Sequence, residues 1–359
     1  MESFVPAPYM AWAKLRPKPR WDLAGSNLLH CSIDDLPGAR EVVELDGPNS
    51  NGYRPLVEAI ARRYGVAADR VATATGASGA NFLVCAALLR PGDDVLVERP
   101  GYDPLLAAPQ MLGARVVRFD RRFEDGYRLD SASVGAALTP RTRLIIVTNT
   151  HNPSGVLASP ESLDEVAREA ESVGAYVLVD EVYLDTASEA PIAPAAARSE
   201  TFISTNSLTK SYGLSGLRCG WVIASPEVAE GVRRARDVVD AEGAFLADRL
   251  ATLAFERLDD LARRARAILG PNREAVRRFL SSRRELEWIE AAGGTVVFPR
   301  LARMTDACPF VDRLLAEEHT AVVPGRFFEA PAHFRISFGG RADVVAHGLA
   351  AIACQLDRM

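Results

Sequence analysis

Short apolar runs bounded by turn residues recur along the first two thirds of the chain. In the clearest of them, Leu144-Ile145-Ile146-Val147, consecutive apolar residues suit a strand that is covered on both faces. Stretches of helical character separate the runs, and this alternation is typical of a largely parallel sheet flanked by helices. The pattern predicts an α/β fold whose large domain holds a mostly parallel sheet of about seven strands. The expected strands are 71–74, 95–98, 115–119, 144–148, 176–181, 202–206 and 220–224.

Two helix starts carry clear local signals. Pro55 opens the stretch 55–64, where a first helical turn tolerates proline. Ser159-Pro160-Glu161 supplies an N-cap, a proline at the first helical position and an acidic first turn. These signals place helices in the connections between strands, as a parallel sheet requires.

The pattern changes after residue 226. Arg- and Ala-rich helical sequence extends to about Ser282, and a closing helix is expected from about Ala342. Short strands lie between them, so this block predicts a second, smaller α+β domain. The expected strands are 286–290, 294–299, 321–323 and 334–338, in a small domain of 1–40 and 241–359 that includes an N-terminal arm, beside a large domain of 41–240.

The composition is that of an ordinary soluble globular protein, with 48% hydrophobic and 25% charged residues among 359. The net charge is −5, which argues against nucleic acid as a partner because phosphate binding favours a basic face. No apolar stretch of about 18 residues occurs, so we expect no membrane partner and a cytoplasmic location.

The cysteines and histidines give no sign of a metal site. The five cysteines form no Cys-x-x-Cys pair, and the five histidines form no His-x-x-x-His pair. We interpret the cysteines as small buried hydrophobes in a reducing compartment and expect no metal. They are Cys31, Cys85, Cys219, Cys308 and Cys354.

Lysine is scarce, which limits where amine chemistry can occur. The only lysines are Lys14, Lys18 and Lys210, and the first two flank Pro17 in a segment of exposed character. Lys210 follows an expected strand in a loop rich in glycine and hydroxyl residues, at the edge where open α/β sheets bind ligands. Taken alone, Lys210 is as well explained by an ordinary loop cation.

Two neighbouring segments add chemistry at the same edge. Asp180 ends an apolar strand, and a carboxylate in such a half-buried place needs a cation or hydrogen-bond donors, for which a protonated heteroaromatic nitrogen is suitable. The segment 75–80 joins a strand to an apolar helix, so its free N–H groups would face an anion such as phosphate. A plain tight turn explains that segment equally well, since it matches no complete phosphate-loop motif.

Together with 99–102, these segments resemble the fold-type I pyridoxal-phosphate-dependent transferases, specifically the class I/II aminotransferase family. The resemblance extends from about Leu23 to the last helix, and the order of the motifs makes it specific. The motifs that carry it are Asn152-Pro-Ser-Gly, Asp180-Glu-Val-Tyr183, Ser207-Leu-Thr-Lys210 with Gly216-Leu-Arg218, and Phe334-Arg335-Ile-Ser.

The resemblance implies pyridoxal 5′-phosphate as the cofactor. Lys210 would form a Schiff base with it and then move a proton between the substrate Cα and the cofactor. Asp180 would pair with the pyridinium nitrogen, so that the ring accepts electrons. Asn152 and Tyr183 would hydrogen-bond the phenolic oxygen, and Tyr102 would stack on the ring.

The remaining residues implied by the family bind the two anionic groups. The phosphate would be held by the turn Gly76-Ala77-Ser78, through the amides of Ala77 and Ser78, and by Ser207 and Arg218. The substrate α-carboxylate would be held by Arg335, which leaves the Cα–H bond perpendicular to the ring. The other residues expected at the substrate are Gly25, Ser26, Asn27 and Asn152.

The resemblance also implies a homodimer with the active site at the subunit interface. Many relatives place a tyrosine before their first helix, where it reaches the phosphate of the neighbouring subunit. Segment 45–52 has no tyrosine there, so Tyr53 or one of the nearby asparagines is expected instead. The N-terminal arm carries little pattern, so the substrate side chain is not predicted.

The expected function is transfer of an amino group from an L-amino acid to a 2-oxo acid. The first alternative is a β-eliminating lyase of the cysteine-S-conjugate type, because the early steps are shared. The second is a non-catalytic, cofactor-binding effector module of a transcription regulator. Such a regulator carries a DNA-binding domain in front, and about 20 residues before Trp21 are too few for a winged helix.

Overall fold

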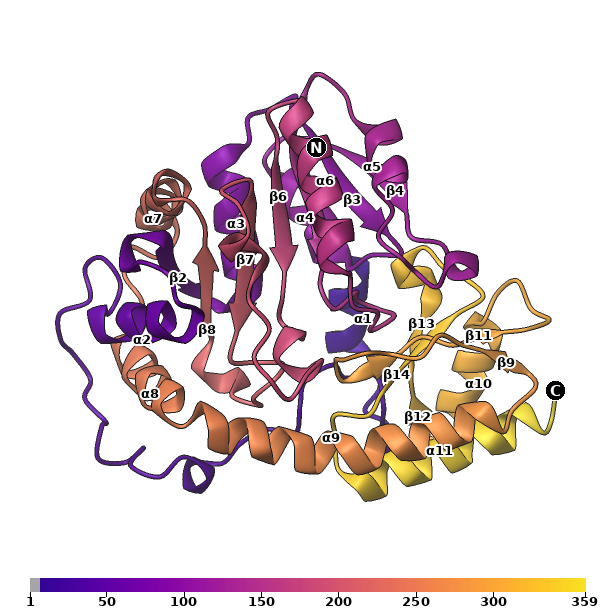
Figure 1. Cartoon of the computed structure of the whole chain (residues 1–359). Helices are drawn as coiled ribbons and strands as arrows, with labels where there is room; N and C mark the ends of the chain where they lie inside the picture. Colours follow the sequence, from indigo (N-terminus) through magenta and orange to yellow (C-terminus); the bar gives the residue numbers. More distant parts are fainter. Residues whose placement is uncertain (1–6) are drawn as a thin grey trace.

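A seven-stranded sheet forms the larger part of the computed structural model, which describes residues 7–359 (Figure 1). The strand order is β2-β8-β7-β6-β5-β3-β4, and β8 alone runs antiparallel to its neighbours. All seven predicted strands are present, so the prediction of a mostly parallel α/β sheet is confirmed. The strands are β2 (Val71–Thr75), β3 (Asp94–Arg99), β4 (Arg115–Asp120), β5 (Thr142–Thr148), β6 (Tyr176–Asp180), β7 (Phe202–Ser207) and β8 (Cys219–Ile223).

Helices cover both faces of this sheet because alternate side chains of each strand point to opposite sides. On β5, Ile145 and Val147 join the hydrophobic cluster that contains α6, whereas Leu144 and Ile146 join the cluster that contains α3, α4 and α7. Both clusters consist of buried apolar side chains, which explains why the strands are continuous apolar runs in the sequence. The helices of this part are α2 (Arg54–Tyr64), α3 (Gly76–Leu88), α4 (Asp103–Met111), α5 (Ser131–Ala137), α6 (Pro160–Ser172) and α7 (Pro226–Val239).

The predicted helix starts are also confirmed. α2 carries Pro55 in its first turn, and the Ser159 side chain caps α6 by accepting a hydrogen bond from the Ser162 N–H at 3.1 Å. Ser159 satisfies a backbone N–H that the first turn of a helix leaves without a partner, and Pro55 has no such N–H to satisfy.

The smaller part is built on two long helices. α9 (Leu258–Ser281) runs along its base beside the closing helix α11 (Ala342–Leu356), and Figure 1 shows both beneath the short strands. The predicted strands are present but short, and α10 (Cys308–Glu318) between them was not predicted. The other elements are α8 (Phe245–Glu256), β9 (Leu286–Glu287), β10 (Val296–Val297), β11 (Arg300–Leu301), β12 (Thr320–Ala321), β13 (Val323–Pro324) and β14 (Phe334–Ser337).

The N-terminal arm crosses between the two parts. α1 (Pro8–Leu15) lies near their junction, and β1 (Trp21–Asp22) pairs in parallel with β12. The domain boundaries at 40/41 and 240/241 stay a prediction, and residues 1–6 of the predicted small domain lie outside the described residues. In the described part of the chain, no helix is both long and apolar enough to cross a membrane.

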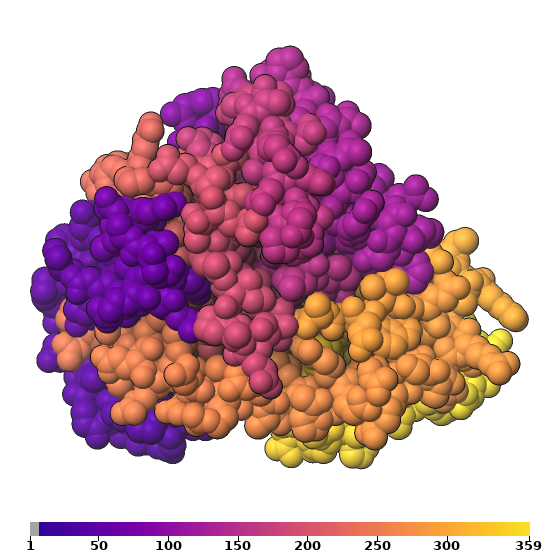
Figure 2. Space-filling view, viewed as in Figure 1, coloured from indigo at the N-terminus to yellow at the C-terminus, as the bar shows by residue number. Residues whose placement is uncertain are grey.

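The two parts are joined by ion pairs as well as by the arm. Arg118 on β4 contacts Glu329 at 2.9 Å, and Arg300 on β11 contacts Glu124 at 2.9 Å. Figure 2 shows the orange and yellow segments of the smaller part lying directly against magenta segments of the larger part. The carboxyl ends of β6 and β7 point toward this junction (Figure 1), and β5 runs parallel to β6, so the residues at the ends of these strands lie there.

Candidate active site

A cleft of about 320 Å³ lies at this edge of the sheet. It brings together residues from strand ends, the start of α3, the loop after β7 and the N-terminal arm. Of the predicted site residues, only Gly76 and Arg335 do not line it, and both contact residues that do. The predicted residues that line the cleft are Gly25, Ser26, Asn27, Ala77, Ser78, Tyr102, Asn152, Asp180, Tyr183, Ser207, Lys210 and Arg218.

Lys210 reaches the floor of the cleft from the loop that follows β7. Its Nζ donates hydrogen bonds to Ser26 Oγ at 2.8 Å and to Asn27 Oδ1 at 2.7 Å. Withdrawal from water, with a smaller contribution from the charge of Arg335, lowers the pKa of this amine to about 7. A substantial fraction of Lys210 is therefore neutral near pH 7, as a nucleophilic amine must be.

Asp180 ends β6 and is buried. Its carboxylate accepts from Asn81 Nδ2 at 2.7 Å and from the Val182 N–H at 3.3 Å, and both donors are neutral. Burial raises the pKa of Asp180, while the hydrogen bond from Asn81 opposes that rise. A buried carboxylate with neutral partners is well suited to a cationic ring nitrogen, because the cation would offset the desolvation.

A close approach of backbone and arginine forms one corner of the cleft. Gly76 opens α3 with a φ of 70°, and a Cβ at this position would collide with the Arg218 guanidinium. The hydroxyl of Thr209, which lines the same cleft, is buried without a hydrogen-bond partner among the described residues. A helix N-terminus, an arginine and an unpaired hydroxyl match the needs of a phosphate group, so the residues present fit pyridoxal phosphate.

Arg335 lies on β14 and is 1% exposed. Its guanidinium donates to Asn152 Oδ1 at 3.1 Å, to the Tyr9 hydroxyl at 2.7 Å and to the Ala24 carbonyl at 3.3 Å. All of these acceptors are neutral, and its Nε has no partner among residues 7–359. A buried cation whose acceptors are all neutral is a strong candidate for binding a carboxylate.

The two predicted tyrosines contact the arm. The Tyr183 hydroxyl donates to the Ser26 carbonyl at 3.3 Å, and burial raises the pKa of Tyr183 to about 12. The Tyr102 hydroxyl donates to the Met10 sulfur at 3.2 Å, and its ring meets the Tyr9 ring edge-on at 5.7 Å. Both phenols therefore stay protonated at neutral pH and can donate hydrogen bonds.

Several cleft residues were missed by the sequence reasoning. Tyr9, Met10 and Ala13 come from α1, which was dismissed as an arm of little pattern, and Asn81 lies behind Asp180 on α3. Pro8 at the first position of α1 is the one local signal that could have marked this helix.

The residues considered in place of the family tyrosine have partners within the chain. Asn49 is buried and donates to the Gly243 carbonyl at 2.9 Å, and the Tyr53 ring packs edge-on against Phe245 at 5.3 Å. Asn51 accepts from Arg234 at 2.9 Å. Which of them serves a neighbouring subunit stays a prediction.

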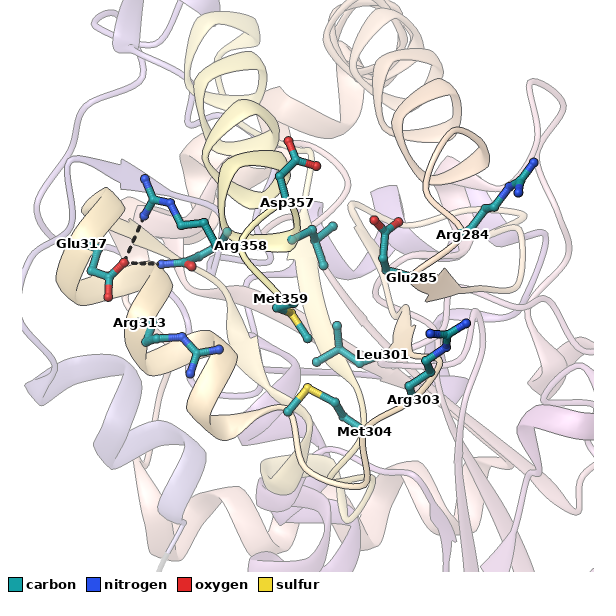
Figure 3. Close-up of a pocket in the computed structure, with 12 residues that line it drawn as sticks. Arg284, Glu285, Leu301, Arg303, Met304, Arg313, Glu317, Asp357, Arg358 and Met359 are labelled. Carbon is teal, nitrogen blue, oxygen red and sulfur yellow. Dashed lines mark hydrogen bonds and ion pairs between the residues drawn. The ribbon is translucent and has the colours of Figure 1, made fainter.

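A larger cavity lies elsewhere in the described structure. It measures about 1130 Å³ and is lined by α10, β11 and the end of α11. Figure 3 shows its acidic and basic side chains interspersed, with Glu317 bridging Arg358 and Gln355. Arg303 and Arg313 are exposed there, so water hydrates their charges. Buried charges, rather than size, distinguish the smaller cleft as the site.

Comparisons of the sequence and of the structure with known proteins agree on one family. A family model described as "Aminotransferase class I and II" matches residues 44–352. Capreomycidine synthase of Streptomyces vinaceus is 32% identical over 336 residues, covering 89% of this chain and 84% of that protein. A PLP-dependent aminotransferase from Streptococcus suis has a structure with a TM-score of 0.93 and 27% identity, covering 100% and 99% of the two chains. The PLP-dependent cyclase OrfR has a TM-score of 0.89 and 28% identity, covering 100% and 98%.

Proposed function

Because the chain belongs to aminotransferase class I and II, a family of pyridoxal-phosphate enzymes, we propose that it transfers an amino group from an L-amino acid to a 2-oxo acid. The observation that carries this proposal is a single cleft that holds a half-buried amine with a pKa of about 7 and a buried carboxylate, next to a buried arginine that donates only to neutral acceptors among the described residues. These are Lys210, Asp180 and Arg335.

We assign residues of the cleft to each group of the cofactor as part of this proposal. When bound, pyridoxal phosphate supplies an aldehyde carbon for a Schiff base, here with Lys210, and a ring that accepts the electron pair of the substrate Cα. Asp180 would keep the ring nitrogen charged. The residues proposed at the phosphate are Gly76, Ala77, Ser78, Ser207, Thr209 and Arg218, and those proposed at the ring and its oxygen are Tyr102, Asn152 and Tyr183.

Arg335 would bind the α-carboxylate of the amino acid. Its burial strengthens the charge-assisted hydrogen bonds, and the contact with Asn152 fixes the plane of the guanidinium. A planar donor pair holds a carboxylate in one orientation, which fixes where the Cα–H bond points.

Lys210 would take the proton from Cα and later return it. A base with a pKa of about 7 exists in both protonation states near neutral pH, so it can accept the proton and then release it without a large penalty. Burial of the amine and the charges of Arg335 and Arg218 lower its pKa, and the carboxylate of Asp180 opposes them.

A half-reaction screen tests the proposal. The purified, cofactor-loaded protein is mixed with single L-amino acids, and the visible absorption band is followed together with oxo acid and ammonia. One equivalent of oxo acid without ammonia supports transfer of the amino group. Absence of oxo acid with every amino acid would contradict it.

A second candidate is chemistry at Cβ, which includes the β-eliminating lyase considered from the sequence. The observation that favours it is the similarity to capreomycidine synthase and to the cyclase OrfR. Removal of the Cα proton is shared, but the electron pair then expels a group from Cβ. In a cyclase, a nucleophile within the same substrate would add at Cβ.

The same screen separates these outcomes. Ammonia with pyruvate from a cysteine conjugate indicates elimination. A product lighter than a β-hydroxy amino acid by one water, without oxo acid or ammonia, indicates ring closure. Turnover of any kind would exclude the non-catalytic effector module.

The homodimer also stays a proposal. Ile33, Val43 and Leu45 are exposed in the segment 33–45, and Leu45 is 85% exposed. Apolar side chains in one exposed segment are consistent with a covering partner, and a second copy of this chain would fit the family. Light scattering tests this, and a monomeric mass at micromolar concentration would contradict it.

A further inference from the structure

The Lys210 amine donates two hydrogen bonds to the N-terminal turn that contains Ser26 and Asn27. Ser26 and Asn27 lie 184 and 183 positions before Lys210, yet their oxygens are its hydrogen-bond acceptors. We propose that Ser26 and Asn27 are positioning residues that hold the neutral Lys210 amine by its N–H bonds and thereby direct its lone pair at the substrate Cα. This inference rests on the proposed function and assigns to the two residues a role different from the substrate contacts that the sequence predicted.

The argument starts from the geometry of an amine. A neutral primary amine has two N–H bonds and one lone pair in tetrahedral directions. In the cleft, Asn27 Oδ1 accepts one N–H at 2.7 Å and Ser26 Oγ accepts the other at 2.8 Å. With both N–H bonds engaged, rotation about the last carbon–nitrogen bond is fixed, and the lone pair has one remaining direction. A flexible lysine stem does not supply this orientation by itself.

The turn that carries the two acceptors is itself held in place. The Ser26 carbonyl accepts from Thr295 Oγ1 at 2.8 Å and from the Tyr183 hydroxyl at 3.3 Å. The Leu28 N–H donates to the carbonyl of Lys210 at 3.2 Å, which ties the turn to the lysine's own backbone. The acceptors and the amine are therefore fixed to a common frame, as positioning requires.

Neutral acceptors suit this task better than charged ones. The charged groups that influence the amine are Asp180 from β6, Arg335 from β14 and Arg218 from the loop before β8. The arginines favour the neutral amine and Asp180 favours the protonated amine. Ser26 and Asn27 orient the amine without adding a negative charge. A negative charge there would favour a third proton on the nitrogen, and the lone pair would then be lost.

The first experiment uses the cofactor-free protein and does not depend on catalysis. The rate at which trinitrobenzenesulfonate modifies Lys210 is measured against pH, and the modified peptide is identified by mass, which is straightforward because the chain has only three lysines. Asn27→Asp is expected to move the midpoint of this profile upward by about one pH unit, because a carboxylate beside the amine favours its charged form.

Gln110→Glu adds the same charge at an exposed position of α4, outside the cleft, and is expected to leave the midpoint unchanged. An unshifted midpoint in Asn27→Asp would overturn the contact.

The second experiment separates positioning from substrate binding. In the loaded enzyme, Asn27→Ala and Ser26→Ala are expected to lower kcat by about 10- to 100-fold and leave KM within about twofold, because the base is misplaced rather than absent. The isotope effect of a Cα-deuterated amino acid should rise, since proton transfer becomes slower. A higher KM with an unchanged isotope effect would overturn the proposal in favour of a substrate contact.

The two experiments also distinguish this inference from the proposed function. Asn27→Gln keeps the amide oxygen and is expected to recover part of kcat. If the unaltered chain turned over no amino acid, the proposed function would fail, whereas the profile of Asn27→Asp would still report the contact.

Discussion

The two halves of the cleft are built in different ways. On the sheet side, Asp180 and Lys210 follow neighbouring strands, and charge buried in the strand ends dominates. On the arm side, the neutral side chains of Tyr9, Ser26 and Asn27 accept hydrogen bonds: Tyr9 from Arg335, and the other two from Lys210. The difference indicates two separate roles: the sheet side supplies the reactive charged groups, and the arm side orients these groups and the substrate. Substitutions on the two sides should therefore differ in size and in kind.

The largest effect is expected for Lys210→Ala on the sheet side. Removing the amine removes both the covalent attachment and the proposed base, so turnover should fall by about 10⁴-fold or more. The visible absorption band and the half-reaction rate measure the two losses. Lys18→Ala is the matched control, because Lys18 is exposed and does not line the cleft. An absorption band unchanged in Lys210→Ala would remove this lysine from its proposed role.

The next effect is expected for Asp180→Asn, which keeps the shape of the side chain but removes its charge. We expect cofactor to remain partly bound and turnover to fall by about 100-fold or more, since the ring nitrogen loses its counter-charge. Stopped-flow absorption measures the half-reaction. Near-normal rates would show that the carboxylate is structural.

Glu181 provides the control for that substitution within the same strand-end segment. It is also buried, and loss of hydration raises its pKa to about 8, while it accepts from the Ala195 N–H at 2.8 Å. It is mostly neutral at pH 7, so Glu181→Gln keeps both the charge state and the acceptor. We expect its turnover to stay within a fewfold of the unaltered enzyme, about the effect of one altered hydrogen bond.

The same division explains what the sequence could predict. The sheet side follows from local patterns, because apolar runs mark strands, and residues just after parallel strands meet at one edge. The positions of Asp180 and Lys210 at this edge could therefore be predicted from the sequence, and the family resemblance implied their roles. The whole large sheet was predicted for the same reason.

The arm side depends on contacts between distant segments, which periodicity does not encode. Tyr9 accepts a hydrogen bond from Arg335 across 326 positions, and nothing in the sequence of the short helix α1 indicates that contact. Ser26 and Asn27 were placed in the cleft by resemblance, but their acceptance of the Lys210 protons became visible only in three dimensions. α10 was missed because its apolar pattern is short and lies between strands that are themselves brief.

Arg335→Ala tests the connection between the two sides. The substitution should weaken binding of the α-carboxylate by about 2 to 5 kcal/mol, as for other buried charge pairs, and leave the cofactor band in place. Amino-acid titration of the loaded enzyme measures this affinity. Arg341→Ala, at an exposed ion pair with Asp343, is the matched control. Unaltered amino-acid affinity in Arg335→Ala would contradict the assignment.

The smallest effect is expected for Tyr9→Phe on the arm side. The Tyr9 hydroxyl accepts from Arg335 and keeps its own proton free to donate to a carboxylate bound there. The ring stays in its contacts with Tyr102 and with Phe328, so only one hydrogen bond is lost. Amino-acid affinity should therefore fall by about 0.5 to 1.5 kcal/mol, with kcat and the isotope effect nearly unchanged.

This outcome would differ from that of Asn27→Ala, although both residues belong to the arm. Tyr9 acts on the arginine that binds the substrate, so its loss should appear in the affinity for the amino acid. Asn27 acts on the amine that moves the proton, so its loss should appear in kcat and the isotope effect. Lys14→Ala, an exposed change on the same helix as Tyr9, controls for disturbance of α1. A fall in kcat with unchanged affinity in Tyr9→Phe would show that α1 acts on the reaction through Lys210, and the arm would then have one role rather than two.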